Sequence, residues 1–281
     1  MIRTDAKSWP PNRLAKKWYR LWYGVRERLT KDVEVVDGNA RYRFRCENMM
    51  EFTRAMSLFT KEVGTCEWLK SEVKPGQVFY DIGANIGIYT ILAARLAGET
   101  GKVFSFEPHS ANFTRLLENI AVNNLQDVVT PCNVALNNED GFFPFNYLSS
   151  EAASSNSQLL SARSVHEVDF KPRVSELKRA ASIDGLVDSG LIDPPDHVKI
   201  DVDGNELLIL NGMKKVLEGK DRPKSIQVEI NDRYKDGIGP FMESLDYALS
   251  DKHYTASGLK LMARGGDPEA YTYNAIFRPG S

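Results

Sequence analysis

The chain has 281 residues, of which 42% are hydrophobic and 26% are charged, and its formal net charge is −2. This composition is typical of a folded protein with one sizeable α/β domain and an extension, and it excludes a largely disordered chain. So small a net charge creates no overall field that attracts nucleic acid, and no nucleic-acid partner is expected.

The first thirty residues are basic, with eight arginines and lysines against Asp5 and Glu27. After Pro10 and Pro11, apolar residues recur at helical spacing and predict an amphipathic helix. Its apolar face carries Leu14, Trp18, Leu21, Trp22, Val25 and Leu29. Two interpretations stay open for residues 9–30: peripheral contact with an anionic membrane surface, or packing on the protein body or on a second copy in a homodimer.

We expect a cytoplasmic protein, peripheral at the inner membrane surface if this helix binds lipid. The N-terminus lacks the continuous apolar core of a signal peptide. No later run approaches the ~20 apolar residues of a membrane span. Three cysteines lie far apart without C-x-x-C spacing, which disfavours a disulfide framework and a zinc site.

Residues 33–44 alternate around Asp37-Gly38-Asn39 and predict a β-hairpin. Residues 52–73 predict one helix that stops at Lys74-Pro75-Gly76. We therefore expect residues 1–74 to form an N-terminal extension and cap, and residues 75–281 to form the main domain.

From residue 77 onward, strand and helix patterns alternate, as in a parallel sheet connected by right-handed crossovers. The predicted strands lie at 77–81, 103–107, 128–134, 197–201 and 225–229. The predicted helices cover 87–97, a stretch capped by Ser110 with Phe113, Leu116, Leu117 and Ile120 inward, 206–219, and a stretch marked by Phe241, Leu245 and Leu249. Strands at 254–261 and 273–277 would close the sheet as an antiparallel pair. The fold class predicted is α/β, a seven-stranded Rossmann-like sheet with helices on both faces and an N-terminal helical extension.

Residues 137–195 interrupt this alternation as an insertion with little predicted structure of its own. Strands are expected at 141–148 and 173–177, a Ser-rich loop at 149–164 and a short helix at 182–187. Such an insertion is often a lid or a binding loop. A tolerated surface insertion is the alternative for its Ser-rich half.

The first predicted strand ends at Asp81 and turns into a helix through Gly83, Asn85 and Gly87. Ligands of open parallel sheets bind beyond the carboxyl ends of the strands, and glycines let the backbone approach a ligand. Glu107 ends the next strand, where an acid can accept hydrogen bonds from ribose hydroxyls. That spacing also fits nicotinamide dinucleotides. The absence of G-x-G-x-x-G favours S-adenosylmethionine, which has no phosphate.

Together these stretches resemble the FkbM-type methyltransferases from about Thr60 to the end of the chain. Asp203 departs from the family pattern, which commonly has Glu there, and residues 57–62 are similar to a subset of the family and are expected to border the cofactor. The matching stretches are Asp81 to Gly87, Phe106-Glu107-Pro108, Asn133 to Leu136, Ser182-Ile183-Asp184, Lys199 to Glu206 and Val228-Glu229-Ile230.

The resemblance implies a seven-stranded methyltransferase sheet and methyl transfer from S-adenosylmethionine. The acceptor would typically be a hydroxyl oxygen on a sugar, a glycan or a secondary metabolite. The implied contacts are Asp81, Gly83, Asn85 and Gly87 with the methionine end, Glu107 with the ribose, Pro108 beside it, and Asn133, Val134 and Ala135 with the adenine edge.

Methyl transfer to an alcohol needs an aligned acceptor, worth roughly 7–11 kcal/mol, and a base that adds about 10²–10⁴-fold. Asp201, at the end of the fourth strand, is the first candidate base, and Glu229, at the end of the fifth, is the second. Alternatively, Asp201 and Glu206 only cap the helix that begins between them. Among the histidines, only His109 follows a motif strand closely enough to reach the cofactor pocket.

A magnesium ion is a less favoured cofactor, and no metal ligands are assigned. Asp201, Glu229, Asn231 and Asp232 would nevertheless bring hard oxygen ligands together on adjacent strand ends. Two other classes of function stay open. One is a cofactor-binding or membrane-surface scaffold without catalysis, and the other is a nicotinamide-dependent reductase. The acceptor itself has no motif, and the insertion and the cap are expected to select it.

Overall fold

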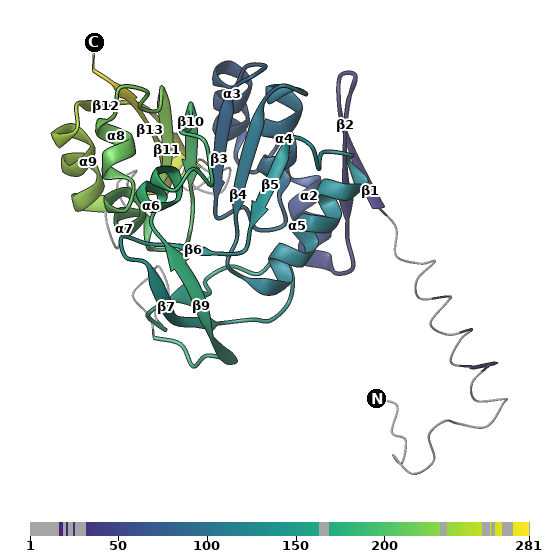
Figure 1. Cartoon of the computed structure of the whole chain (residues 1–281). Coiled ribbons are helices and arrows are strands. Elements are labelled where there is room, and N and C mark those ends of the chain that lie inside the picture. The colour runs from purple at the N-terminus through teal and green to yellow at the C-terminus, as the bar shows by residue number, and fades with distance from the viewer. Residues whose placement is uncertain are drawn as a thin grey trace.

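The computed structural model of the chain describes residues 17–18, 21, 25, 32–162, 169–230, 235–254, 259, 262–265 and 272–280 (Figure 1). Most of the predicted helix at 9–30 lies outside these residues. Lys17, Trp18, Leu21 and Val25 are helical, and the three apolar side chains among them are exposed. No helix formed by the described residues is long and apolar enough to cross a membrane.

A seven-stranded sheet with the order β12-β13-β11-β10-β3-β4-β5 forms the centre of the protein. β13 runs antiparallel to β11 and β12, and the other adjacent strands of this sheet are parallel. β3 pairs with both β4 and β10, so the order of the strands reverses at β3. The predicted fold class is confirmed. The strands are β3 (Val78–Ile82), β4 (Lys102–Phe106), β5 (Val129–Cys132), β10 (His197–Ile200), β11 (Ser225–Ile230), β12 (Tyr247–Tyr254) and β13 (Tyr273–Pro279).

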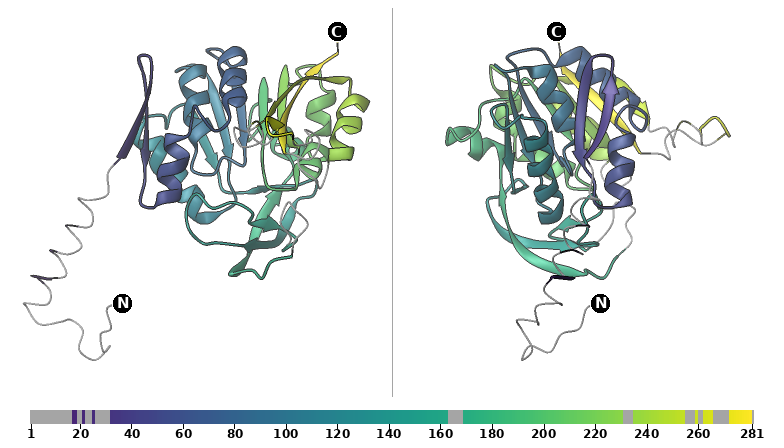
Figure 2. Two further views of the ribbon diagram at one scale, coloured as in Figure 1. Left: turned by 180° about the vertical axis from the view of Figure 1, so that it is seen from behind. Right: turned by 90° about the vertical axis from the view of Figure 1, so that its right-hand side faces the viewer.

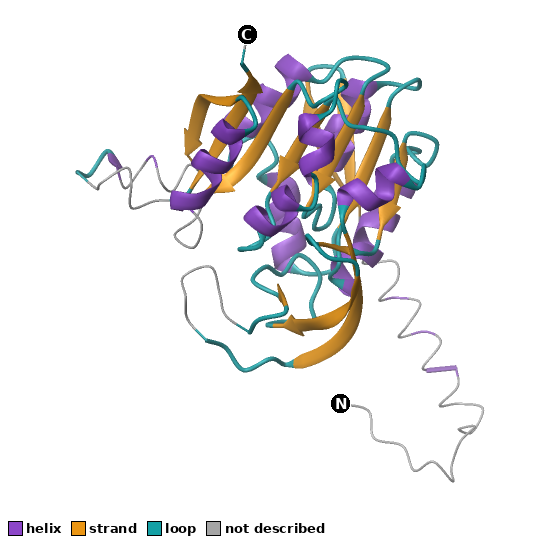
Figure 3. Cartoon of the chain, turned by 60° about the vertical axis from the view of Figure 1, so that its left-hand side comes forward, coloured by secondary structure: helices purple, strands orange, loops and turns teal. Residues whose placement is uncertain are grey.

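Helices cover both faces of this sheet (Figure 3). Phe79 and Tyr80 are consecutive in β3 and point to opposite faces, as a strand requires. Phe79 joins a hydrophobic cluster with α3 (Val63–Glu72), α4 (Ile88–Ala97) and α5 (Ser110–Val122). Tyr80 joins a second cluster with α6 (Ile183–Asp188), α7 (Glu206–Asn211), α8 (Lys214–Glu218) and α9 (Lys235–Ser244).

The predicted hairpin is present as β1 (Asp32–Asp37) and β2 (Ala40–Arg45), at the edge of the protein opposite the C-terminal strands (Figure 2). The single helix predicted at 52–73 is wrong, because the chain forms α2 (Met49–Met56) and α3 with a turn between them. Leu58 in that turn is fully buried, and its carbonyl accepts a hydrogen bond from the Cys66 thiol at 3.0 Å. The turn thus places Leu58 in the hydrophobic core between the two helices.

The division of the chain at residue 74 stays a prediction. α3, which precedes it, packs directly on the sheet. The ring of Trp68 lies 6.0 Å from that of Phe79, and its Nε1 donates to Ser225 Oγ at 3.0 Å.

The insertion has more structure than its sequence indicated. It contributes three strands of a second sheet with the order β6-β9-β7-β8, and β6 lies just before it in the chain. This sheet projects below the carboxyl ends of the main strands in Figure 1. The strand predicted at 173–177 extends to residue 181. Its second half was not predicted because Lys178 occupies a buried position where an apolar residue is expected. Residues 163–168 lie outside the described residues. The strands are β6 (Ala135–Leu136), β7 (Gly141–Tyr147), β8 (Gln158–Leu159) and β9 (Val174–Ala181).

Two further expectations near the C-terminus are wrong. The helix expected at 206–219 divides into α7 and α8 at Gly212, whose carbonyl accepts a hydrogen bond from Asp184 N at 2.9 Å. Leu249 was expected in a helix but lies in β12, where it is exposed and pairs with Phe277 of β13. Most of the strand predicted at 254–261 lies outside the described residues.

Candidate active site

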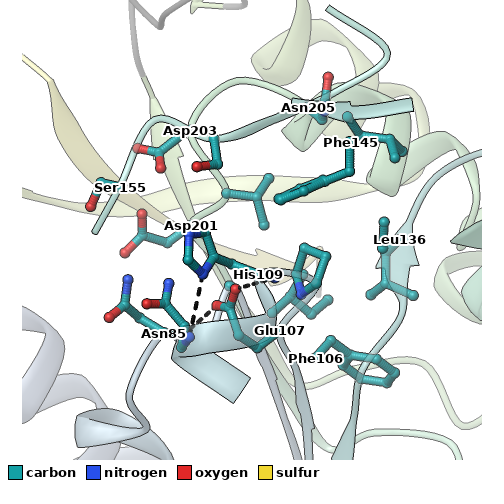
Figure 4. Close-up of a pocket in the computed structure, with 18 of the residues that line it drawn as sticks. Asn85, Phe106, Glu107, His109, Leu136, Phe145, Ser155, Asp201, Asp203 and Asn205 are labelled. Carbon is teal, nitrogen blue, oxygen red and sulfur yellow. Dashed lines mark hydrogen bonds between the residues drawn. The ribbon is translucent and has the colours of Figure 1, made fainter. Parts of the chain in front are cut away.

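A cavity opens where β3, β4 and β10 end, at the reversal of strand order where open α/β sheets bind ligands. Its empty volume, counting the open mouth, is about 780 Å³. Figure 4 shows Asp201, Asp203 and Ser155 gathered on one side, whereas Phe106, Leu136 and Phe145 lie toward the other. The cavity therefore has a polar side and an apolar side.

The turn between β3 and α4 forms one wall. Its backbone has positive φ at Gly83 (80°), Asn85 (53°) and Gly87 (86°). A Cβ on Gly83 would overlap the carbonyl oxygen of Asp201, so the turn lies directly against the end of β10. Only glycine combines that φ with so close an approach of two backbones.

Glu107 is almost fully buried at the end of β4 and ties two segments of the cavity together. Its Oε2 accepts from Asn85 N at 2.7 Å and its Oε1 accepts from His109 N at 2.8 Å. Burial raises the pKa of Glu107 to about 7, although these two backbone N–H groups act in the opposite direction. The carboxylate retains acceptor capacity for a ligand that brings hydroxyl donors.

His109 lines the cavity and begins α5. Its Nδ1 accepts from Asn112 N at 3.3 Å, so Nε2 is the nitrogen that donates to the carbonyl of Ser149 at 2.8 Å. Burial lowers the pKa of the ring, which is neutral in this arrangement. The cap predicted at Ser110 is thus one residue too late, and Leu117, predicted inward, is exposed.

A fully buried lysine supports the first candidate base. Lys199 Nζ lies 2.9 Å from Asp201 Oδ2 and 3.9 Å from Asp81 Oδ1. Burial alone would raise the pKa of Asp201, but the charge of Lys199, and then that of Lys61, holds it below its usual value. Burial and the nearby Asp201 charge raise the pKa of Glu229 well above its usual value. The surroundings therefore favour the ionised form of Asp201 and the protonated form of Glu229.

The structure brings seven of the predicted site residues to the cavity wall: Gly83, Asn85, Glu107, Pro108, Val134, Ala135 and Asp201. Four others do not line it. Asp81 is buried and accepts from Thr90 Oγ1 at 2.6 Å, and Gly87 lies against Leu116. Asn133 Nδ2 donates to the carbonyl of Glu107 at 2.7 Å, and Glu229 is close enough to Asp201 for that charge to act on its pKa. The roles given to all eleven stay predictions.

Residues 149–158, here called the strap, close one side of the cavity. The carbonyl of Ser154 accepts from Asn85 Nδ2 at 2.9 Å and from Asn112 Nδ2 at 3.1 Å. Asn156 N donates to Asp203 Oδ2 at 2.6 Å. The strap is therefore held by side chains of the turn after β3, of α5 and of the segment after β10.

Sequence reasoning missed Arg54 and the strap serines as lining residues. Arg54 lies on α2 and lines the cavity, whereas residues 57–62, predicted to border the cofactor, do not line it. No local pattern distinguishes Arg54 from a surface arginine on a helix. Serines in a Ser-rich stretch likewise carry no positional signal.

The magnesium hypothesis gains no support from the described residues. They contain no group of three or more His, Cys, Asp or Glu side chains placed to hold a metal ion. Asn231 and Asp232, two of the proposed ligands, lie outside them.

Comparison with known proteins identifies related sequences. Residues 81–255 match the model of the methyltransferase FkbM domain. The hexuronic acid methyltransferase AglP of Haloferax volcanii is 29% identical over 176 residues, which cover 63% of this chain and 66% of AglP. The chain thus matches just under two thirds of the length of that relative.

Two solved structures are similar to this chain at low identity. A candidate rRNA methylase of Clostridium thermocellum has 15% identity and a TM-score of 0.48, with 79% of this chain and 97% of its own covered. The methyltransferase FkbM of Methylobacillus flagellatus has 15% identity and a TM-score of 0.46, with 75% and 50% covered. Because the FkbM model spans more than half of the 281 residues, the chain belongs to the FkbM methyltransferase family.

Proposed function

We propose that this protein is an S-adenosylmethionine-dependent O-methyltransferase that acts on a hydroxyl of a sugar or a glycan. One observation carries the proposal: buried Glu107 and ionised Asp201 line a single cavity at the switch point of the sheet, within the residues that match the FkbM domain. The name of AglP, a hexuronic acid methyltransferase, supports a sugar acceptor.

The lining residues suit S-adenosylmethionine. Glu107 would accept hydrogen bonds from the ribose, and Val134, Ala135 and Leu136 would lie along the adenine. The turn that contains Gly83 and Asn85 would hold the methionine end. When bound, this cofactor supplies an electrophilic methyl group, so the protein chiefly has to align the acceptor.

Asp201 would take the proton that the acceptor hydroxyl must lose. It lines the cavity in its ionised form, and Lys199 fixes its orientation from behind. Burial favours the protonated form of Glu229, and that form cannot take the proton. A positioned base of this kind typically contributes about 10²–10⁴-fold to the rate.

Cofactor affinity should depend on pH through Glu107. Its pKa of about 7 means that the carboxyl is largely protonated at lower pH, whereas ribose hydroxyls bind the ionised form better. We expect affinity to rise with pH, by up to about tenfold per unit below pH 7, and to level off above it. Calorimetry across this range measures the effect.

Glu107→Gln is the control for this dependence, because the amide does not titrate. The variant should bind S-adenosylmethionine weakly and with a flat pH profile near neutrality. An unchanged slope in Glu107→Gln would assign the titration to another group.

The proposed activity is tested by incubating the protein with S-adenosylmethionine and a panel of sugars, nucleotide sugars and lipid-linked glycans. Release of S-adenosylhomocysteine reports turnover, and a product methyl group that survives mild alkali is an ether rather than an ester. Cofactor binding without turnover on any acceptor would favour the scaffold. Binding of NAD(H) in place of S-adenosylmethionine would favour the reductase.

The remaining predictions about partners have direct tests. A role for Mg²⁺ predicts loss of turnover in EDTA and recovery on adding the ion, and full turnover in EDTA would exclude it. Peripheral contact of residues 9–30 with the inner membrane surface predicts that anionic liposomes carry the whole chain, but not a chain that begins at Lys31. A homodimer through the same residues predicts that the shorter chain is monomeric.

A further inference from the structure

Arg54 stands in the cavity wall although it belongs to a helix outside the main sheet. α2 is anchored by a capping box between Asn48 and Glu51, and Glu51 accepts from Arg115 Nε at 2.7 Å. Glu51 is fully buried, so this end of α2 is held firmly against α5. Arg54, one turn later, is thereby directed to the polar side of the cavity.

The strap fixes the guanidinium of Arg54. Nε donates to the carbonyl of Ala153 at 2.9 Å, and Nη2 donates to Ser155 Oγ at 2.5 Å. No hydrogen bond from Nη1, and no ion pair of Arg54, is formed with the described residues. A planar guanidinium held by two neutral acceptors keeps its full charge and one edge available for a ligand.

The positive charge of Arg54 is not neutralised by the acidic residues of the cavity. Among the described residues that line it, Arg54 carries the one permanent positive charge. The carboxylates nearby have other partners: Asp201 pairs with Lys199 Nζ at 2.9 Å, and Asp203 accepts from Asn156 N at 2.6 Å. Arg54 thus forms no ion pair with Asp201 or Asp203.

We infer that the acceptor carries a carboxylate and that Arg54 binds it, which makes acidic sugars the substrate class of this site. The inference rests on the proposed function and names its acceptor. A guanidinium edge matches a carboxylate in shape and charge, and gives stronger hydrogen bonds than a neutral hydroxyl would. The acidic sugar in the name of AglP agrees with this class.

The main alternative is that Arg54 only supplies positive charge near Asp201 and Asp203, whose carboxyl groups feel it. Lys61 offers a matched control, because its charge also reaches both acids. Yet Lys61 does not line the cavity, has a half-exposed side chain and pairs with Glu62 at 2.9 Å. A second alternative, that Arg54 only holds the strap, is controlled by Ser155→Ala.

The test compares binding of p-nitrophenyl β-D-glucuronide and p-nitrophenyl β-D-glucoside to the protein saturated with S-adenosylhomocysteine. Saturation-transfer NMR or calorimetry gives both affinities without requiring turnover. The wild-type chain should prefer the glucuronide by about 10- to 100-fold, the range expected for hydrogen bonds to a charged group. Arg54→Gln should lose most of that preference, and Arg54→Lys should lose part of it. Lys61→Gln and Ser155→Ala should each retain it.

Equal affinity of the wild-type chain for the two probes would overturn the inference. So would an equal loss of preference in Arg54→Gln and Lys61→Gln, because charge alone would then explain the effect. Thermal unfolding of each variant, with and without S-adenosylhomocysteine, checks that the fold and the cofactor site persist. Turnover on neutral sugars without any preference would remove the acidic acceptor and leave the proposed function standing. Preference for the glucuronide without turnover on any acceptor would support carboxylate binding by Arg54 and contradict the proposed activity.

Discussion

Replacing Asp201 with asparagine is expected to lower kcat by about 10²–10⁴-fold, the contribution of a positioned general base. The amide keeps the size of the side chain and still accepts from Lys199, but it cannot take the proton of the acceptor hydroxyl. Asp201 is not expected to hold the ribose or the adenine, so the affinity for S-adenosylmethionine should change far less than kcat. Single-turnover kinetics with saturating cofactor, alongside calorimetry, separate the two quantities.

Glu229→Gln is the matched comparison for Asp201→Asn. The pKa of Glu229 is raised well above its usual value, so glutamine resembles the neutral form of the acid that burial favours. Its effect on kcat should be much smaller than that of Asp201→Asn. The reverse order would transfer the role of base to Glu229, and equal, small effects in both variants would remove general-base catalysis by either acid.

Asp201→Asn should also lower stability, since it leaves the buried Lys199 ammonium with Asp81 at 3.9 Å as its remaining anionic contact among the described residues. Thermal unfolding measures this loss independently of kinetics. Asp201 is partly exposed, so solvent weakens the ion pair and the loss should be modest. A variant that stays folded and binds cofactor, but turns over slowly, is the outcome that separates catalysis from folding.

The main sheet was predictable because its information is local. Strands β3, β4, β10 and β11 are short, and an acidic residue of the motifs lies within one position of the last residue of each. Gly83 and Gly87 indicate the turn from β3 to α4 in the sequence, because few other residues readily adopt their positive φ. Such features follow from a few consecutive residues, so sequence alone could place the cofactor side of the cavity.

The acceptor side was not predictable, because it depends on contacts between distant segments. The guanidinium of Arg54 is held in the cavity wall by hydrogen bonds to Ala153 and Ser155 of the strap, about 100 positions later in the chain. The predicted strand was shorter than β9 because the inward Lys178 interrupts the apolar alternation that indicates a half-buried strand. The buried Leu58 broke a helix that local spacing predicted as continuous.

Gly83→Ala is the second substitution expected to have a large effect. A Cβ there would overlap the backbone carbonyl of Asp201, and alanine is also unfavourable at a φ of +80°. Backbone atoms cannot change rotamer to relieve the overlap as a flexible side chain can, so the turn and the end of β10 must move apart. Overpacking and the left-handed conformation together should cost about 2–5 kcal/mol, which would lower Tm by roughly 5–15 °C.

Gly38→Ala separates the two causes, because Gly38 also has positive φ (58°) but a Cβ there would meet nothing within 4 Å. It should lower Tm slightly and leave cofactor affinity unchanged, since the hairpin turn lies outside the cavity wall. Gly83→Ala should lose measurable affinity for S-adenosylmethionine even below its own Tm. If both variants lost the same small stability and both bound cofactor normally, the contact between Gly83 and Asp201 would not control the site. Loss confined to Gly83→Ala would instead show that the cofactor turn and the candidate base are held in place by one backbone contact.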